Sequence, residues 1–132
     1  MVVSLPTLGS AAGYVEAVVD TGAEITTLMP QGVRALNLRH TDVQALSGPV
    51  MNMVGVGGAA TFKLTPAQVY LIDSSGQGVT SPFAVEIALA ASPPPPDDGA
   101  SAPLALLGRD ILNRCDHSFS FRNGTVAIDS PE

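Results

Sequence analysis

Short apolar stretches separated by glycine, proline and other turn residues run through the whole chain. Six of these stretches have the length and composition of β-strands: residues 14–19, 25–28, 59–64, 68–72, 82–89 and 104–107. Runs of this kind between turn signals are typical of all-β domains. Two short helices fit as well, one that begins at Pro30 and one over residues 109–114. The pattern therefore predicts an all-β fold with one or two short helices.

Two hairpins stand out in this pattern. Residues 43–60 alternate apolar with small residues and contain a cluster of three glycines, which predicts a glycine-tipped hairpin with residues 59–64 as its return strand. Near the end of the chain, apolar and polar residues alternate on both sides of Asn123-Gly124. This dipeptide favours a type I′ turn, so we expect a second hairpin over residues 118–129.

Length and composition narrow the function classes. The 132 residues fit one domain, residues 1–132, with a proline-rich exposed loop at residues 91–103. A net charge of −6 argues against a nucleic-acid binder, which needs a basic face. Hydrophobic residues at 45% against 14% charged exclude a disordered chain. They also indicate that some apolar surface is hidden in an oligomer.

The sequence gives little support for a metal site or a membrane-spanning segment. The single cysteine, Cys115, excludes a disulfide within the chain and any cysteine-rich zinc site. Asp116 and His117 follow it, but consecutive residues of a strand point to opposite faces. We therefore expect no metal and no cofactor. No apolar run reaches the ~18–20 residues of a membrane span. A cytoplasmic protein is favoured, or a soluble domain cut from a longer protein, which could carry a membrane anchor.

The strongest local signal is Asp20-Thr21-Gly22, directly after the strand predicted over residues 14–19. A carboxylate followed by glycine at a strand end indicates a tight loop, because glycine lets the backbone approach a ligand or a second backbone closely. Taken alone, the tripeptide fits a plain turn as well as a functional loop.

Three segments in order resemble the retropepsins, the retroviral-type aspartic proteases, and especially their bacterial members. They are AVVDTGAEITTLMP (residues 17–30), VMNMVGVGGAATFKL (residues 50–64) and LALLGRDIL (residues 104–112). They are similar to the active-site loop, the glycine-rich flap and the segment with the short helix near the end of that fold. The resemblance implies a small closed β-barrel of the single-lobe acid-protease type.

The chemistry of peptide hydrolysis fits this resemblance. It needs one ionised carboxyl to take a proton from water and one protonated carboxyl to support the carbonyl oxygen. The chain carries one Asp-Thr-Gly sequence. The second carboxyl must then be Asp20 of another copy, so we expect a homodimer with two-fold symmetry.

The resemblance also implies roles for individual residues. Asp20 is the catalytic residue. The hydroxyl of Thr21 grips the opposing loop across the dimer axis, Gly22 presents its carbonyl to the substrate, and Ala23 is small enough to fit beneath it. The flap folds over a bound peptide with Val54, Gly55, Val56, Gly57 and Gly58.

Arg109, after Leu-Leu-Gly, is similar to the structural arginine of the family, which pairs with an acid just after the active-site loop. That acid is Glu24 here, and we expect a buried ion pair. Asp110 is interpreted as a helix-terminus or surface carboxylate without a catalytic role.

The function predicted from these motifs is an aspartic endopeptidase that acts on polypeptides. The alternative is a catalytically silent module on the same fold, for peptide binding or dimerisation. A metal- or phosphate-dependent hydrolase is disfavoured, because metal-ligand spacings are missing and no Gly-Lys-Ser/Thr follows the flap glycines.

Overall fold

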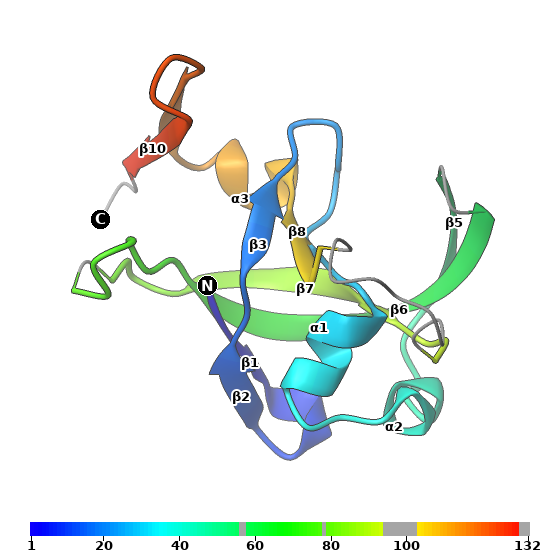
Figure 1. Ribbon diagram of the computed structural model, residues 1–132. Coiled ribbons are helices and arrows are strands. Elements are labelled where there is room, and N and C mark those ends of the chain that lie inside the picture. The colour runs from blue at the N-terminus through cyan, green and yellow to red at the C-terminus, as the bar shows by residue number, and fades with distance from the viewer. Residues whose placement is uncertain (56–57, 78, 94–102, 130–132) are drawn as a thin grey trace.

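Strands dominate the computed structural model, which describes residues 1–55, 58–77, 79–93 and 103–129 (Figure 1). Within these ranges eight strands form one sheet. They are β1 (Val2–Leu5), β2 (Ala11–Tyr14), β3 (Ala17–Val19), β4 (Thr27–Leu28), β5 (Val50–Gly55), β6 (Gly58–Tyr70), β7 (Phe83–Ala90) and β8 (Ala105–Leu107). Two further strands, β9 (Asp116–Ser120) and β10 (Thr125–Asp129), pair only with each other in the described part of the chain.

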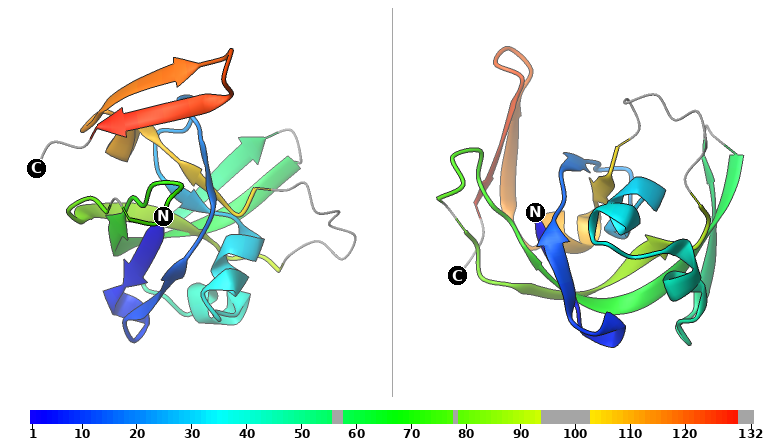
Figure 2. Two further views of the ribbon diagram at one scale, coloured as in Figure 1. Left: turned by 60° about the vertical axis from the view of Figure 1, so that its left-hand side comes forward. Right: turned by 60° about the horizontal axis from the view of Figure 1, so that its bottom comes forward.

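The large sheet curls into a half-barrel (Figure 2). Its strands follow the order β2-β1-β6-β7-β4-β8-β3, and β5 pairs with the N-terminal half of β6. Neighbouring strands are antiparallel except for the parallel pairs β3–β8 and β4–β7. The end strands β2 and β3 have no register pairs with each other among the described residues. The mostly β fold was predicted, whereas a closed barrel is not seen in the described structure.

The long strand β6 replaces two shorter ones that the sequence predicts. Residues 59–64 and 68–72 were expected as separate strands, but β6 runs without a break through Pro66. Its register with β5 ends at Lys63 and its register with β1 begins at Gln68. Pro66 therefore lies between two neighbours on that edge, where a missing backbone donor is tolerated.

The strand predicted over residues 14–19 is divided in the structure. β2 ends at Tyr14 and pairs with β1, whereas β3 begins at Ala17 and pairs with β8 at the opposite end of the sheet. Val15, between them, is fully buried and its amide donates to the carbonyl of Met1 at 2.8 Å. The continuous prediction was wrong because the chain changes its pairing partner in the middle of one apolar run.

Short helical segments pack against strands β6 and β7 of the sheet. They are the 3-10 turn η1 (Pro6–Leu8), α1 (Pro30–Ala35), α2 (His40–Gln44) and α3 (Arg109–Leu112). α1 begins at Pro30 as predicted, while α2 was not predicted. A Cβ on Gly32 of α1 would lie 2.1 Å from the Leu104 carbonyl oxygen, so this glycine lets the helix approach the chain before β8. The core between sheet and helices includes fully buried Leu28, Ile87 and Ile111.

The hairpin predicted over residues 118–129 is formed by β9 and β10, but its turn differs. The register pairs Ser120 with Thr125, which leaves a four-residue loop. Gly124 has a positive φ of 62°, whereas Asn123 does not. A type I′ turn needs positive φ at both central residues, so that prediction was wrong.

The proline-rich segment 91–103 lies largely outside the described residues. Ala91, at its start, is buried, donates its amide to the Thr61 carbonyl and accepts from the Gln44 side chain. Ala91 therefore belongs to the core rather than to an exposed loop.

Candidate active site

The loop of residues 20–26, which we call the Asp20 loop, connects β3 to β4 across the end of β8. It has to cross β8 because β8 lies between β3 and β4 in the sheet. Figure 1 shows the loop as the blue arch above these strands. The Asp20 amide donates to the Leu107 carbonyl at 3.0 Å, which extends the parallel pairing of β3 with β8 by one residue. The start of the loop is thereby fixed to the sheet.

Asp20 shapes the loop with its own side chain. Its Oδ1 accepts a hydrogen bond of 2.8 Å from the Gly22 amide, and its carbonyl accepts one of 3.2 Å from the Ala23 amide. Such aspartate-centred turns are common in tight loops. A Cβ on Gly22 would lie 3.1 Å from Oδ1, which is a tight contact. The carboxylate is half-buried at the surface, so it is oriented and still reachable from solvent.

The turn between β8 and α3 supports the loop from below. The Arg109 amide donates to the Ala23 carbonyl at 2.9 Å, and the Asp110 amide donates to the Glu24 carbonyl at 3.2 Å. Gly108 passes directly under the loop, where a Cβ would lie 2.7 Å from the Ile25 carbonyl carbon. A side chain at position 108 would therefore push the two segments apart.

Thr26 and Asp110 lock the other end of the loop. The Asp110 carboxylate accepts hydrogen bonds from the Thr26 amide at 3.0 Å and from the Thr26 hydroxyl at 2.7 Å. The same hydroxyl accepts a bond of 3.1 Å from the Gly108 amide. Thr26 is fully buried, so these bonds are shielded from water. Both ends of the Asp20 loop are therefore anchored to the segment of residues 107–110.

Sequence reasoning missed this role of Asp110. The interpretation as a helix-terminus carboxylate holds in part, because Asp110 also accepts from the Ile111 amide in the first turn of α3. Its bonds to Thr26 join residues 84 positions apart. The available signal was a polar threonine within an apolar stretch, together with a carboxylate two residues after a strand-end glycine.

The ion pair between Glu24 and Arg109 is present but exposed. Arg109 Nη2 lies 3.3 Å from Glu24 Oε1, and the two side chains keep 82% (Glu24) and 46% (Arg109) of their surface accessible. The expected burial was wrong, because the loop reaches this turn through backbone bonds and leaves both side chains at the rim. Exposed pairs of this kind contribute little to stability.

The remaining loop residues have no contact that tests their expected roles. Thr21 is exposed on the loop, and Ala23 is half-buried. The grip of Thr21 across a dimer axis, the substrate contact of the Gly22 carbonyl and the place of Ala23 beneath a substrate stay predictions, because each of them concerns a second molecule.

The predicted flap corresponds to the β5–β6 hairpin, whose register runs from Val50 opposite Lys63 to Gly55 opposite Gly58. Val54 near its end is 85% exposed. Val56 and Gly57 lie outside the described residues. The hairpin stands on the same side of the molecule as the Asp20 loop (Figure 1).

No metal-binding group is found in the described residues. A search of residues 1–55, 58–77, 79–93 and 103–129 found no set of three or more His, Cys, Asp and Glu side chains close enough to hold an ion. His117 instead packs edge-on against Phe119, with ring centroids 5.6 Å apart.

Comparisons with models of known protein families and with curated protein sequences found no match for this chain. Within the described ranges, every helix is too short or too polar to cross a bilayer.

Proposed function

We propose that this chain is an aspartic endopeptidase of the retropepsin type, active as a homodimer in which two Asp20 carboxyls share one proton. One observation carries the proposal: the Asp20 carboxylate is half-exposed on a loop that β8 and the turn before α3 hold at both ends. A pair of reacting carboxyls needs positions fixed to within about 0.5 Å, which a doubly anchored loop can provide.

The second copy follows from the chemistry. Each chain carries one Asp-Thr-Gly sequence, and a two-fold axis brings identical loops face to face. Two carboxylates ~3 Å apart cannot both ionise, so one Asp20 keeps its proton while the other loses it. In that dimer, Thr21 of each copy bonds to the opposing loop and the curled sheets become the two lobes of a barrel-type acid protease.

The proposed reaction moves protons through the two Asp20 side chains. The ionised Asp20 takes a proton from a water molecule while the water oxygen attacks the scissile carbonyl carbon. The protonated Asp20 gives its proton to the carbonyl oxygen, which forms a tetrahedral diol. The carbon–nitrogen bond then breaks, and the amine leaves with a proton from the first Asp20 while the diol returns one to the second. No covalent intermediate is formed.

The substrate of this reaction is an extended polypeptide. It lies between the Asp20 loops and the β5–β6 hairpins, and it adds backbone hydrogen bonds in the manner of a strand. The small side chain of Ala23 leaves room for the substrate, and the Gly22 carbonyl accepts a hydrogen bond from one of the substrate's backbone amides. The flap covers it with Val54, Gly55, Val56, Gly57 and Gly58, and thereby excludes water.

The experiment that tests the proposal is cleavage of a peptide library by the purified chain. Asp20→Asn should abolish cleavage, because an amide cannot take the proton of the water. Its Oδ1 can still accept from the Gly22 amide, so the fold and the dimer should be unchanged. Glu86→Gln, at an exposed carboxylate on β7, is the matched control and should cleave like the wild type. Full turnover by Asp20→Asn would refute the mechanism.

Two further readouts separate the alternatives. A shared proton predicts a bell-shaped pH profile, because activity is lost when both carboxyls are protonated or both are ionised. A chelator should leave cleavage unchanged, whereas inhibition by it would favour a metal-dependent hydrolase. If the wild type protects a labelled peptide without cutting it between roughly pH 3 and 7, a silent binding module on the same fold is the correct function.

A further inference from the structure

The β9–β10 hairpin forms a small sheet of its own in the described structure. A two-stranded hairpin is marginally stable in water unless a face packs against something else. Figure 1 shows β9 and β10 standing apart from the large sheet, on the same side of the molecule as the Asp20 loop. The hairpin is therefore a candidate for an interface.

The two faces of this hairpin differ in chemistry. The register places Phe119 opposite Val126 and His117 opposite Ile128, so these four side chains share one face. The other face carries polar residues and one alanine: Asp116, Ser118, Ser120, Thr125, Ala127 and Asp129. On the apolar face, Phe119 keeps 44% and Val126 keeps 42% of its surface exposed. This face is only partly covered by its own chain.

An open cleft of about 630 Å³ separates the hairpin from the large sheet. Val126 and Ile128 line one side, and Tyr14, Val19 and Leu107 are among the residues that line the other. The acidic side chains Glu16, Asp73 and Asp129 also line it. The cleft therefore has a mixed lining, with apolar side chains on both sides and three acidic side chains among them.

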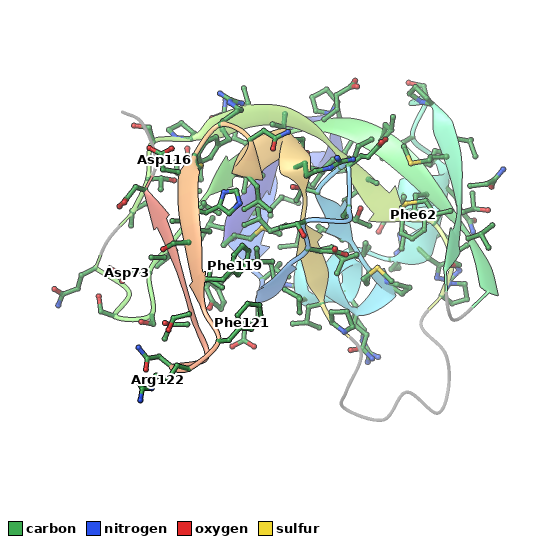
Figure 3. All side chains as sticks on the ribbon, turned by 90° about the horizontal axis from the view of Figure 1, so that it is seen from above. Phe62, Asp73, Asp116, Phe119, Phe121 and Arg122 are labelled. Atoms are coloured by element: carbon green, nitrogen blue, oxygen red, sulfur yellow. The ribbon has the colours of Figure 1, made fainter. Side chains whose placement is uncertain are left out.

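The end of the same hairpin has complementary chemistry. Phe121 is 97% exposed, and Arg122 beside it is exposed as well. Figure 3 shows both residues at the end of the hairpin, with Phe119 further back along it. Phenylalanine and arginine side chains of this kind are typical anchors of protein interfaces. An aromatic ring suits the apolar walls of the cleft, and a guanidinium suits its acidic side chains.

We propose that the occupant of the cleft is the hairpin end of a second copy of this chain. Phe121 of each copy enters the cleft of the other, and Arg122 faces Glu16 there. A two-fold axis makes the two contacts identical, so they close the dimer without leaving a free surface for a third copy. The inference rests on the proposed function, because the Asp20 site is incomplete until a second copy lies on this side of the molecule.

The first test measures the dimer and not the chemistry. Sedimentation equilibrium of the full chain should give a dimer for the wild type, and Phe121→Ser should raise the dissociation constant by at least ~100-fold, because two buried rings are lost per dimer. Val50→Ser is the matched control: Val50 is 58% exposed on β5, and this variant should dimerise like the wild type. A wild type that is monomeric, or a Phe121→Ser variant that dimerises normally, would overturn the proposal.

A charge exchange tests whether Arg122 of one copy lies opposite Glu16 of the other. Arg122→Glu and Glu16→Arg should each weaken the dimer, and the double variant should recover most of the affinity because the pair is restored with opposite signs. If the double variant is weaker than either single variant, the two side chains do not face each other and the assignment is wrong.

Fluorescence provides an independent readout. The chain has no tryptophan, so Phe121→Trp introduces a single reporter. Its emission should shift to the blue as the protein concentration rises, and to the red on dilution. A red emission that does not change with protein concentration would show that position 121 stays in water, which contradicts the proposal.

These experiments can refute the proposed interface and the proposed function independently of each other. If the hairpin holds a dimer that cleaves no peptide, the interface is correct and the endopeptidase proposal is not. If Phe121→Ser dimerises and cleaves normally while Asp20→Asn is inactive, the endopeptidase proposal stands and the interface lies elsewhere.

Discussion

Replacing Thr26 with valine removes one hydroxyl from the anchor of the Asp20 loop and little else. Valine has nearly the shape of threonine, and Thr26 is fully buried. The hydroxyl donates to Asp110 at 2.7 Å and accepts from the Gly108 amide at 3.1 Å. Thr26→Val therefore leaves a buried amide without its acceptor and takes from Asp110 one of its hydrogen bonds.

The expected cost follows from these two losses. A buried donor without a partner costs about 1–3 kcal/mol, and a hydrogen bond to a charged group contributes about 1.5–3 kcal/mol. Asp110 is half-buried and keeps its bonds to the amides of Thr26 and Ile111, so the lower end of the second range applies. The added methyl group returns up to about 0.8 kcal/mol. The free energy of unfolding should fall by about 2–4 kcal/mol, which lowers Tm by roughly 10 °C in a domain of this size.

Urea and thermal unfolding followed by circular dichroism measure this cost, and Thr27→Val is the matched control. Thr27 is the next residue and is also buried, but its hydroxyl donates only to the Ile25 carbonyl at 2.9 Å. One neutral hydrogen bond contributes about 1 kcal/mol. If Thr26→Val costs no more than Thr27→Val, the hydroxyl does not anchor the loop and the reasoning is refuted.

Two smaller predictions concern the Glu24–Arg109 ion pair and the Cys115 thiol. Arg109→Ala should change the free energy of unfolding by less than about 1 kcal/mol in urea, because the pair with Glu24 is exposed; a loss of several kcal/mol would show that the pair is shielded from water. Burial raises the pKa of the Cys115 thiol, which lowers its thiolate fraction at neutral pH. Iodoacetamide should therefore alkylate Cys115 in the folded chain more slowly than it alkylates the free thiol of glutathione, and urea should remove the difference. Faster alkylation of Cys115 in the folded chain would contradict a raised pKa.

Residues close together in the chain were enough to predict several elements. Pro30 marks the start of α1, and the glycine cluster marks the turn region of the β5–β6 hairpin. The alternation around Phe119 and Val126 predicts the last hairpin and its two faces. These features depend on backbone conformation and on the two-residue period of a strand, which are local properties.

Other features depend on which segments meet. One apolar run became β2 and β3 because their partners, β1 and β8, lie far apart in the sheet. The curl of the sheet and the exposure of the Glu24–Arg109 pair likewise depend on packing between distant segments. A local pattern contains no information on pairing partners, so these outcomes differed from the expectations.

The candidate site divides in the same way. Its reactive group, Asp20, and the tight turn that follows it can be recognised in the sequence, because a carboxylate and a glycine two residues later form that turn by themselves. The support of the site by Asp110 and Gly108 comes only from the folded chain. Hydrogen bonds over 84 residues form when β8 is inserted between β3 and β4, and no spacing along the chain encodes that insertion.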